Sequence, residues 1–106
     1  MFIKMRIFVH KLNNYLMRNR IVKFNISERL GNFVHFEFTL GNGEVFSGLT
    51  YYFDYILNSG MFYNEDKIAV KHGSSLWYEL FNCMVTYNLE CLDEGKDLLG
   101  NRIEYA

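Results

Sequence analysis

The sequence predicts an α+β fold, in which a small antiparallel sheet of three to four strands forms a meander. An N-terminal helix and a long, largely buried C-terminal helix would pack on this sheet. Three observations predict it. Apolar residues recur at helical spacing over 75–92. Apolar and polar residues alternate strictly over 21–27 and 32–40, which is typical of strands. Gly41-Asn42-Gly43 separates two apolar runs, as a hairpin turn does.

Residues 75–92 form the longest predicted element. Wound at about 100° per residue, their apolar side chains occupy well over half of the helix circumference. A surface helix normally shows an apolar face of roughly 100°, so we expect this helix to be covered on two sides. Ser74 or Ser75 can cap its start, and Asp93-Glu94-Gly95 predicts its end.

Residues 1–19 match two patterns. Ile3, Met5, Ile7 and Val9 alternate as in a strand, whereas a longer set of apolar residues from Met5 onward falls within about 120° of a helix. We therefore predict a helix. Its basic edge would consist of residues spaced by seven, namely Lys4, Lys11 and Arg18.

The strands over 21–27 and 32–40 each have a face that we expect to point to the core. The residues on those faces are Val22, Phe24, Ile26, Val34, Phe36, Phe38 and Leu40. A two-residue loop at 42–43 would pair Thr39 with Phe46. Phe46 would then point outward beside His35 and Glu37, so either another part of the chain covers that face or Phe46 is a contact residue.

The segment 49–58 is ambiguous, because it alternates like a strand but also has aromatic residues at helical spacing. Asn58-Ser59-Gly60 resembles a helix end, so we predict a short helix there. We expect brief strands at 67–70 and 102–105. The resulting order of elements resembles that of double-stranded-RNA-binding domains. The resemblance does not extend to the lysine cluster at the start of their last helix, and residues 49–54 contain no basic side chain.

Length and composition predict one domain over residues 1–106, since half of the residues are apolar and 18% are aromatic. Phe, Tyr, Asn, Ile and Lys are abundant, as in products of AT-rich genes of low-GC bacteria, their viruses or mobile elements. Cys83 and Cys91 are about 12 Å apart on a helix, too far for a disulfide. Lys4 and Arg6 interrupt the apolar N-terminal run, so we expect no export signal and a cytoplasmic protein, in the host cytoplasm if viral.

Charge is distributed unevenly along the chain. Residues 1–30 have a net charge of +6, and residues 31–106 have a net charge of −7. Such asymmetry can mark a surface that binds nucleic acid. The residues that would contact phosphate are Lys4, Lys11, Arg18 and Arg20.

No motif for catalysis or metal binding is present. His35 and Glu37 would lie about 6.5–7 Å apart on one strand face, which permits acid–base chemistry but is also common on sheet surfaces. The histidines and cysteines lack ligand spacing, and Gly41-Asn42-Gly43 precedes a strand, not a helix. We therefore expect no enzyme, no metal and no cofactor. We expect Tyr51, Tyr52, Phe53 and Tyr55 to be aromatic residues of the core and its rim. Any that are exposed, such as Tyr51 and Tyr55, would suit a protein interface.

These observations lead to one prediction and one alternative. We predict a small non-enzymatic module that binds a protein, such as a phage or mobile-element inhibitor of a host or defence protein, resembling anti-CRISPR inhibitors in role. The alternative is a nucleic-acid-binding accessory protein that uses the basic N-terminal helix. A homodimer is expected because the helix at 75–92 has more apolar surface than a small monomer covers. No membrane association is expected.

Overall fold

The computed structural model describes residues 20–53, 55–58 and 60–104, and these residues form an α+β fold. The elements are β1 (Ile21–Leu30), β2 (Phe33–Leu40), β3 (Val45–Phe53), β4 (Ile56–Leu57), β5 (Met61–Tyr63) and α2 (Ser75–Asp93). The predicted N-terminal helix, with Lys4, Lys11 and Arg18, lies outside the described residues.

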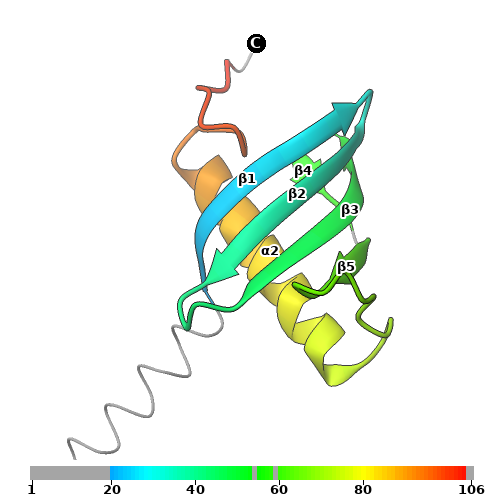
Figure 1. The fold of residues 1–106 in the computed structure, drawn as a ribbon. Helices are drawn as coiled ribbons and strands as arrows, with labels where there is room; N and C mark the ends of the chain where they lie inside the picture. Colours follow the sequence, from blue (N-terminus) through cyan, green and yellow to red (C-terminus); the bar gives the residue numbers. More distant parts are fainter. Residues whose placement is uncertain (1–19, 54, 59, 105–106) are drawn as a thin grey trace, which may run out of the picture.

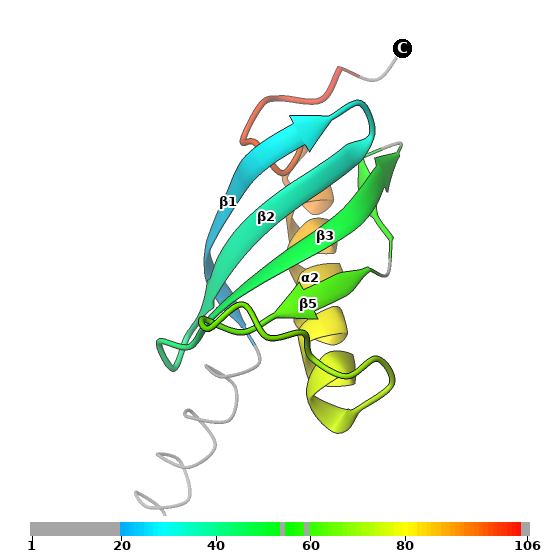
Figure 2. The same ribbon diagram turned by 45° about the vertical axis from the view of Figure 1, so that its right-hand side comes forward.

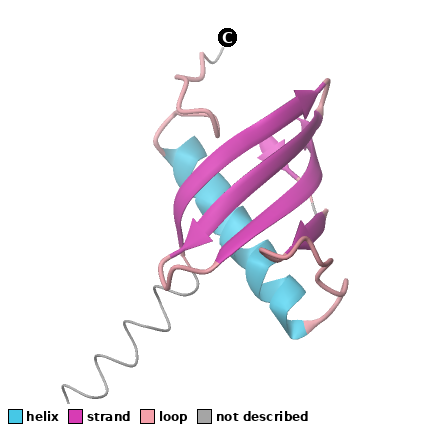
Figure 3. Cartoon of the chain, viewed as in Figure 1, coloured by secondary structure: helices cyan, strands magenta, loops and turns pink. Residues whose placement is uncertain are grey.

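The sheet is a curled antiparallel meander of β1, β2 and β3. Beyond β3, the sheet edge is divided between two short strands: β5 pairs with residues 47–49, and β4 pairs with residues 52–53. Helix α2 crosses one face of this sheet (Figures 1 and 2). None of the described residues forms a layer over the opposite face (Figure 3).

The bounds of α2 agree with the prediction from sequence. Ser74 is the N-cap, and its Oγ accepts a hydrogen bond from the backbone N–H of Trp77 at 3.2 Å. The helix ends at Asp93, and Gly95 follows with φ of 72°, as expected of a residue just beyond a helix end. The expected cover on two sides is wrong for the described residues, because α2 packs on the sheet while Tyr78 and Leu89 are exposed.

The core lies between α2 and the inner face of the sheet. Phe62 of β5 meets Phe36 and Phe38 edge to face, with ring centroids 6.5 and 6.2 Å apart. The Trp77 ring also meets the Phe62 ring, with centroids 5.9 Å apart, and its Nε1 donates to the carbonyl of Gly60 at 3.2 Å. Aromatic rings therefore join the first turn of α2 to β5, with the geometries that aromatic pairs prefer.

The hairpin between β2 and β3 differs from the prediction by one residue. Val45 pairs with Thr39, and Phe46 pairs with Phe38. The N–H of Gly43 donates to the carbonyl of Leu40, so residues 41–43 form a three-residue loop, with Gly43 at a φ of 91°. A one-residue shift in register moves each side chain to the other face. Phe46 is therefore 5% exposed and lies in the core, so its predicted contact role is wrong.

The predicted short helix at 49–58 is also wrong. Residues 49–53 continue β3: residues 49–51 pair with β2, and residues 52–53 pair with β4 after a turn. The buried amide of Asn88 holds this turn against α2: its Oδ1 accepts from Leu57 N–H at 2.8 Å, and its Nδ2 donates to the Tyr55 carbonyl at 2.9 Å. Tyr55 has a φ of 65°, which a non-glycine residue adopts only when its surroundings impose it.

Three smaller predictions also need correction. An irregularity in β1 between Ile21 and Lys23 leaves Val22 exposed, although we expected it in the core. The predicted strand at 67–70 is reduced to a single bridge between Tyr63 and Ala69. Within the described part of 102–105, the predicted strand is likewise only a bridge from Arg102 to Lys96.

Candidate functional site

The face of the sheet opposite α2 is the candidate site, and we call it the outer face. Side chains alternate along β3, so Thr50 and Tyr52 are buried on the inner face, whereas Leu49, Tyr51 and Phe53 are exposed on the outer face. A strand with apolar residues on both faces is normally covered on both sides.

Six large apolar side chains on the outer face form what we call the outer apolar patch. Their exposed fractions range from 39% for Tyr51 to 70% for Leu30. The members of the patch are Leu30, Phe33, Leu49, Tyr51, Phe53 and Met61.

The strand register brings these residues together from four strands. Leu30 lies opposite Phe33, which lies opposite Tyr51, and Leu49 lies opposite Met61. The Phe33 and Tyr51 rings meet edge to face at 5.4 Å, and the Tyr51 and Phe53 rings stack at 6.2 Å. Asn32 Nδ2 donates to the Tyr51 hydroxyl at 3.2 Å. Neighbouring side chains thus hold the aromatic rings in place, which reduces the entropy lost when a partner binds.

His35 and Glu37 occupy the outer face next to the patch. The Ser27 hydroxyl donates to the His35 carbonyl at 3.0 Å, and its Oγ lies 2.5 Å from His35 Nδ1. The Ser27 hydroxyl therefore contacts both the backbone and the ring of His35. The imidazole is therefore oriented by Ser27.

A hollow of about 490 Å³ with a mixed polar and apolar lining lies between β1, β2 and the start of β3. Its polar lining includes Lys23, Asn25, Glu37 and Thr39, but not His35. The predicted acid–base pair therefore does not share this hollow. Among the described residues, no group of three or more His, Cys, Asp or Glu side chains could hold a metal ion.

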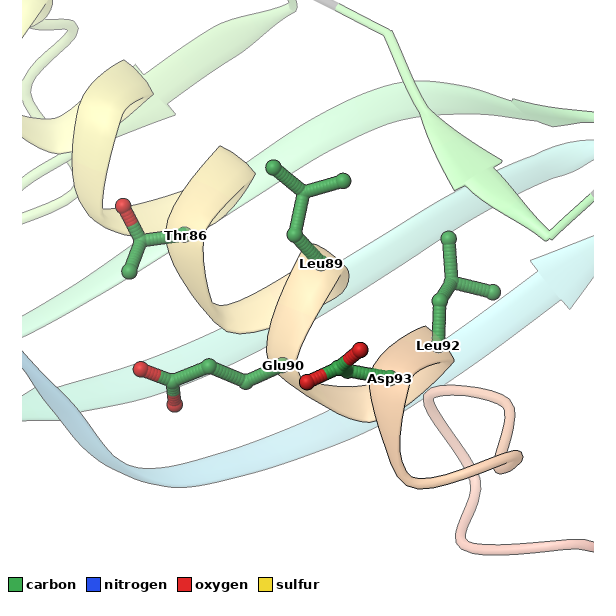
Figure 4. A pocket seen from close by; sticks show the side chains of 5 residues that line it. All are labelled: Thr86, Leu89, Glu90, Leu92 and Asp93. Carbon is green, nitrogen blue, oxygen red and sulfur yellow. The ribbon is translucent and has the colours of Figure 1, made fainter.

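A second, more open hollow of about 520 Å³ lies on the solvent side of α2. Figure 4 shows Leu89 and Leu92 projecting to one side of the helix, and the carboxylate of Glu90 pointing away from them. Asp93 also lines it. This hollow offers two leucines beside two acidic groups, far less apolar surface than the outer face.

The cysteines are a test of how well α2 is packed, because both are free thiols. Burial, and to a smaller extent the carboxylate of Glu79, raise the pKa of Cys83 to about 11. Only about a thousandth of this thiol is ionised at pH 8, against roughly a quarter of an ordinary cysteine. We expect iodoacetamide to modify Cys83 in the folded protein at least 100-fold more slowly than in urea, as measured by mass spectrometry.

This raised pKa also links stability to pH. The thiol keeps its proton more tightly in the folded state, so its contribution is complete below about pH 8.5 and is lost as the pH rises toward 11. If Cys83 reacts at the same rate in the folded and the unfolded protein, the packing described for α2 is wrong.

The residues selected from sequence have different locations. Arg20 is exposed immediately before β1, and Tyr55 is exposed at the turn after β3, outside the patch. Among the predicted binding residues that the structure describes, only Tyr51 belongs to the outer apolar patch. The alternation over 49–53 could have revealed Leu49 and Phe53, had this segment been assigned as a strand.

Comparison with protein-family models gives no match, and comparisons with curated proteins and with solved structures find no significantly similar chain. No helix formed by the described residues is both long enough and apolar enough to cross a membrane.

Proposed function

We propose that this protein is a non-enzymatic module that binds another protein through the outer apolar patch. The observation that carries the proposal is the exposure of six large apolar side chains, Phe33, Tyr51 and Phe53 among them, on a sheet face opposite the helix. Contiguous exposed apolar surface of this kind marks interaction sites on water-soluble proteins. Aromatic residues and methionine are also enriched at the centres of protein interfaces.

The size of the patch suits a protein partner. From the exposed fractions and side-chain areas of roughly 150–250 Å², we estimate about 500–600 Å² of exposed apolar area. A standard interface buries about 800 Å² on each partner. The patch would thus supply the central part of such an interface, with its polar neighbours, including His35 and Glu37, at the rim.

The charge balance of the chain favours a protein partner over nucleic acid. Eleven Lys and Arg side chains stand against twelve Asp and Glu side chains, a net charge of −1. The alternative, binding of nucleic acid, depends on Lys4, Lys11 and Arg18 outside the described residues, together with Arg20. It predicts that log affinity falls linearly with log salt, by nearly one per phosphate neutralised.

In its narrower form, the proposal is that the target is a host or defence protein and that binding inhibits it. The protein would then act in the host cytoplasm as a phage or mobile-element product, in the manner of an anti-CRISPR inhibitor. Two observations support this form: an amino-acid composition typical of the products of AT-rich genes, and a binding surface that needs no cofactor.

The test is capture of a target from the lysate of a low-GC bacterial host by wild-type protein and matched variants. Phe33→Asp places a charge in the patch, whereas Leu89→Asp places one on α2 at nearly the same exposure, 57% against 58%. Interface hot spots contribute about 2–4 kcal/mol, so we expect Phe33→Asp to weaken binding 30-fold or more and Leu89→Asp to leave it unchanged.

Nuclease treatment should not release the captured protein. Far-UV circular dichroism confirms that each variant is folded. Binding that survives Phe33→Asp and also Phe53→Asp would refute the outer apolar patch as the binding surface, and release by nuclease would favour the alternative.

A further inference from the structure

We propose that in the free protein a second copy of this chain occupies the outer apolar patch, giving a two-fold symmetric dimer. This inference rests on the proposed function, because it names a partner for the same surface. The sequence also suggested a homodimer, but through the apolar surface of the C-terminal helix. We now expect the contact on the face of the sheet opposite that helix, where Phe33, Tyr51 and Phe53 are exposed.

Charge is the first argument for self-association at this surface. A two-fold interface brings identical groups of the two copies close together, so that any charge near the axis meets its own copy. None of the six side chains of the outer apolar patch is charged at neutral pH. The hollow on α2 contains Glu90 and Asp93, and pairing that hollow with itself would set like charges against each other.

Area is the second argument. If both patches were covered, the two copies would bury about 1,000–1,200 Å² from these side chains, which approaches the 1,200–2,000 Å² of specific interfaces. Their polar neighbours would add to this area. An interface at the lower end of the range is typically weak, so we expect roughly micromolar affinity. A dimer of this strength can exchange its second copy for a target that binds more tightly.

Sheet geometry is the third argument. Two sheets pack face to face about 10 Å apart when each presents apolar side chains on the facing side. The outer faces of the two copies meet this requirement along β3, at Leu49, Tyr51 and Phe53, and at Phe33, the first residue of β2. Helix α2 of each copy would lie on the outside of the resulting four layers, with Leu89 still exposed, and so it supplies the matched control.

The experiment is sedimentation velocity of the full chain from 1 to 500 µM at low and high salt. We expect a shift from monomer to dimer over this range for the wild-type protein and for Leu89→Asp. Phe33→Asp and Phe53→Asp should each raise the dissociation constant at least tenfold. An apolar contact is not screened by ions, so 1 M NaCl should leave the dimer intact.

Three results would overturn the inference: a monomer at 500 µM, a dimer that both patch variants leave unchanged, or a dimer that 1 M NaCl dissociates. The last would assign the contact to opposite charges. The outcome is separable from the proposed function. If the protein is a monomer and Phe33→Asp abolishes target binding, the dimer is rejected and the proposed function stands. If the dimer depends on the patch but Phe33→Asp does not affect target binding, the dimer stands and the proposed function is rejected.

Discussion

Replacing Asn88 with alanine is expected to lower the free energy of unfolding by about 2–4 kcal/mol. Its buried amide makes two hydrogen bonds, to the N–H of Leu57 and to the carbonyl of Tyr55. Removing one partner of a buried hydrogen bond costs about 1–3 kcal/mol, because the remaining group stays desolvated. The loss also releases the turn that holds Tyr55 at positive φ. Urea denaturation followed by circular dichroism measures the change.

Asn82 provides the control, because it is an exposed asparagine on the same helix. Asn82→Ala should change stability by less than about 0.5 kcal/mol. Equal losses for the two substitutions would show that the Asn88 contacts do not stabilise the fold.

Asn88→Asp tests the same contacts through pH. A carboxylate can still accept from Leu57 N–H, but it faces the carbonyl oxygen of Tyr55 in place of a donor. Burial should raise the pKa of this aspartate in the folded state. The protonated form is then favoured by folding, so the deficit relative to wild type should shrink as the pH falls toward 4 and grow as it rises toward 7.

Gly48→Ala is expected to destabilise the protein by about 2–3 kcal/mol through overpacking. Gly48 lies opposite Phe36 in the sheet, and the Phe36 ring lies directly across it. A Cβ on Gly48 would stand 2.8 Å from Cε2 and 2.9 Å from Cε1 of this fully buried ring, and would also overlap Cζ. The ring has little room to retreat, because it packs against Phe24, Phe38 and Phe62.

A double-mutant cycle with Phe36→Leu separates this clash from a general effect on the strand. Leucine removes the far end of the ring, so Gly48→Ala should cost much less in the Phe36→Leu background. We expect a coupling energy of at least about 1 kcal/mol, as found for residues in direct contact. Additive effects in thermal or urea denaturation would contradict the close approach of Phe36 to Gly48.

The predictions from sequence succeeded where the structure depends on local periodicity. Helix α2 was found between its cap at Ser74 and its end at Asp93, because one run of residues contains both the apolar spacing and the capping signals. The inward face of β2 was found for the same reason. These features require no knowledge of what the element packs against.

The errors have a common physical origin in strand pairing. Phe46 was assigned to the wrong face because the length of the loop at 41–43 sets the register of β3. Residues 49–58 were assigned to a helix because aromatic residues satisfied both periods. The segment forms strands because β3 makes hydrogen bonds to β2, and because the amide of Asn88, more than thirty positions away, binds the backbone of Leu57.

The sequence by itself determined the class of the fold, the main helix, the first two strands and the free state of the cysteines. Only the tertiary structure decided how β3 pairs with β2, and thus which aromatic residues of β3 face away from α2. A strand such as β3 has apolar side chains on both faces, and its alternation looks the same whichever face the helix takes. The outer apolar patch, with Phe33 and Phe53, follows from that choice, because its residues come from separate strands that only the folded sheet brings together.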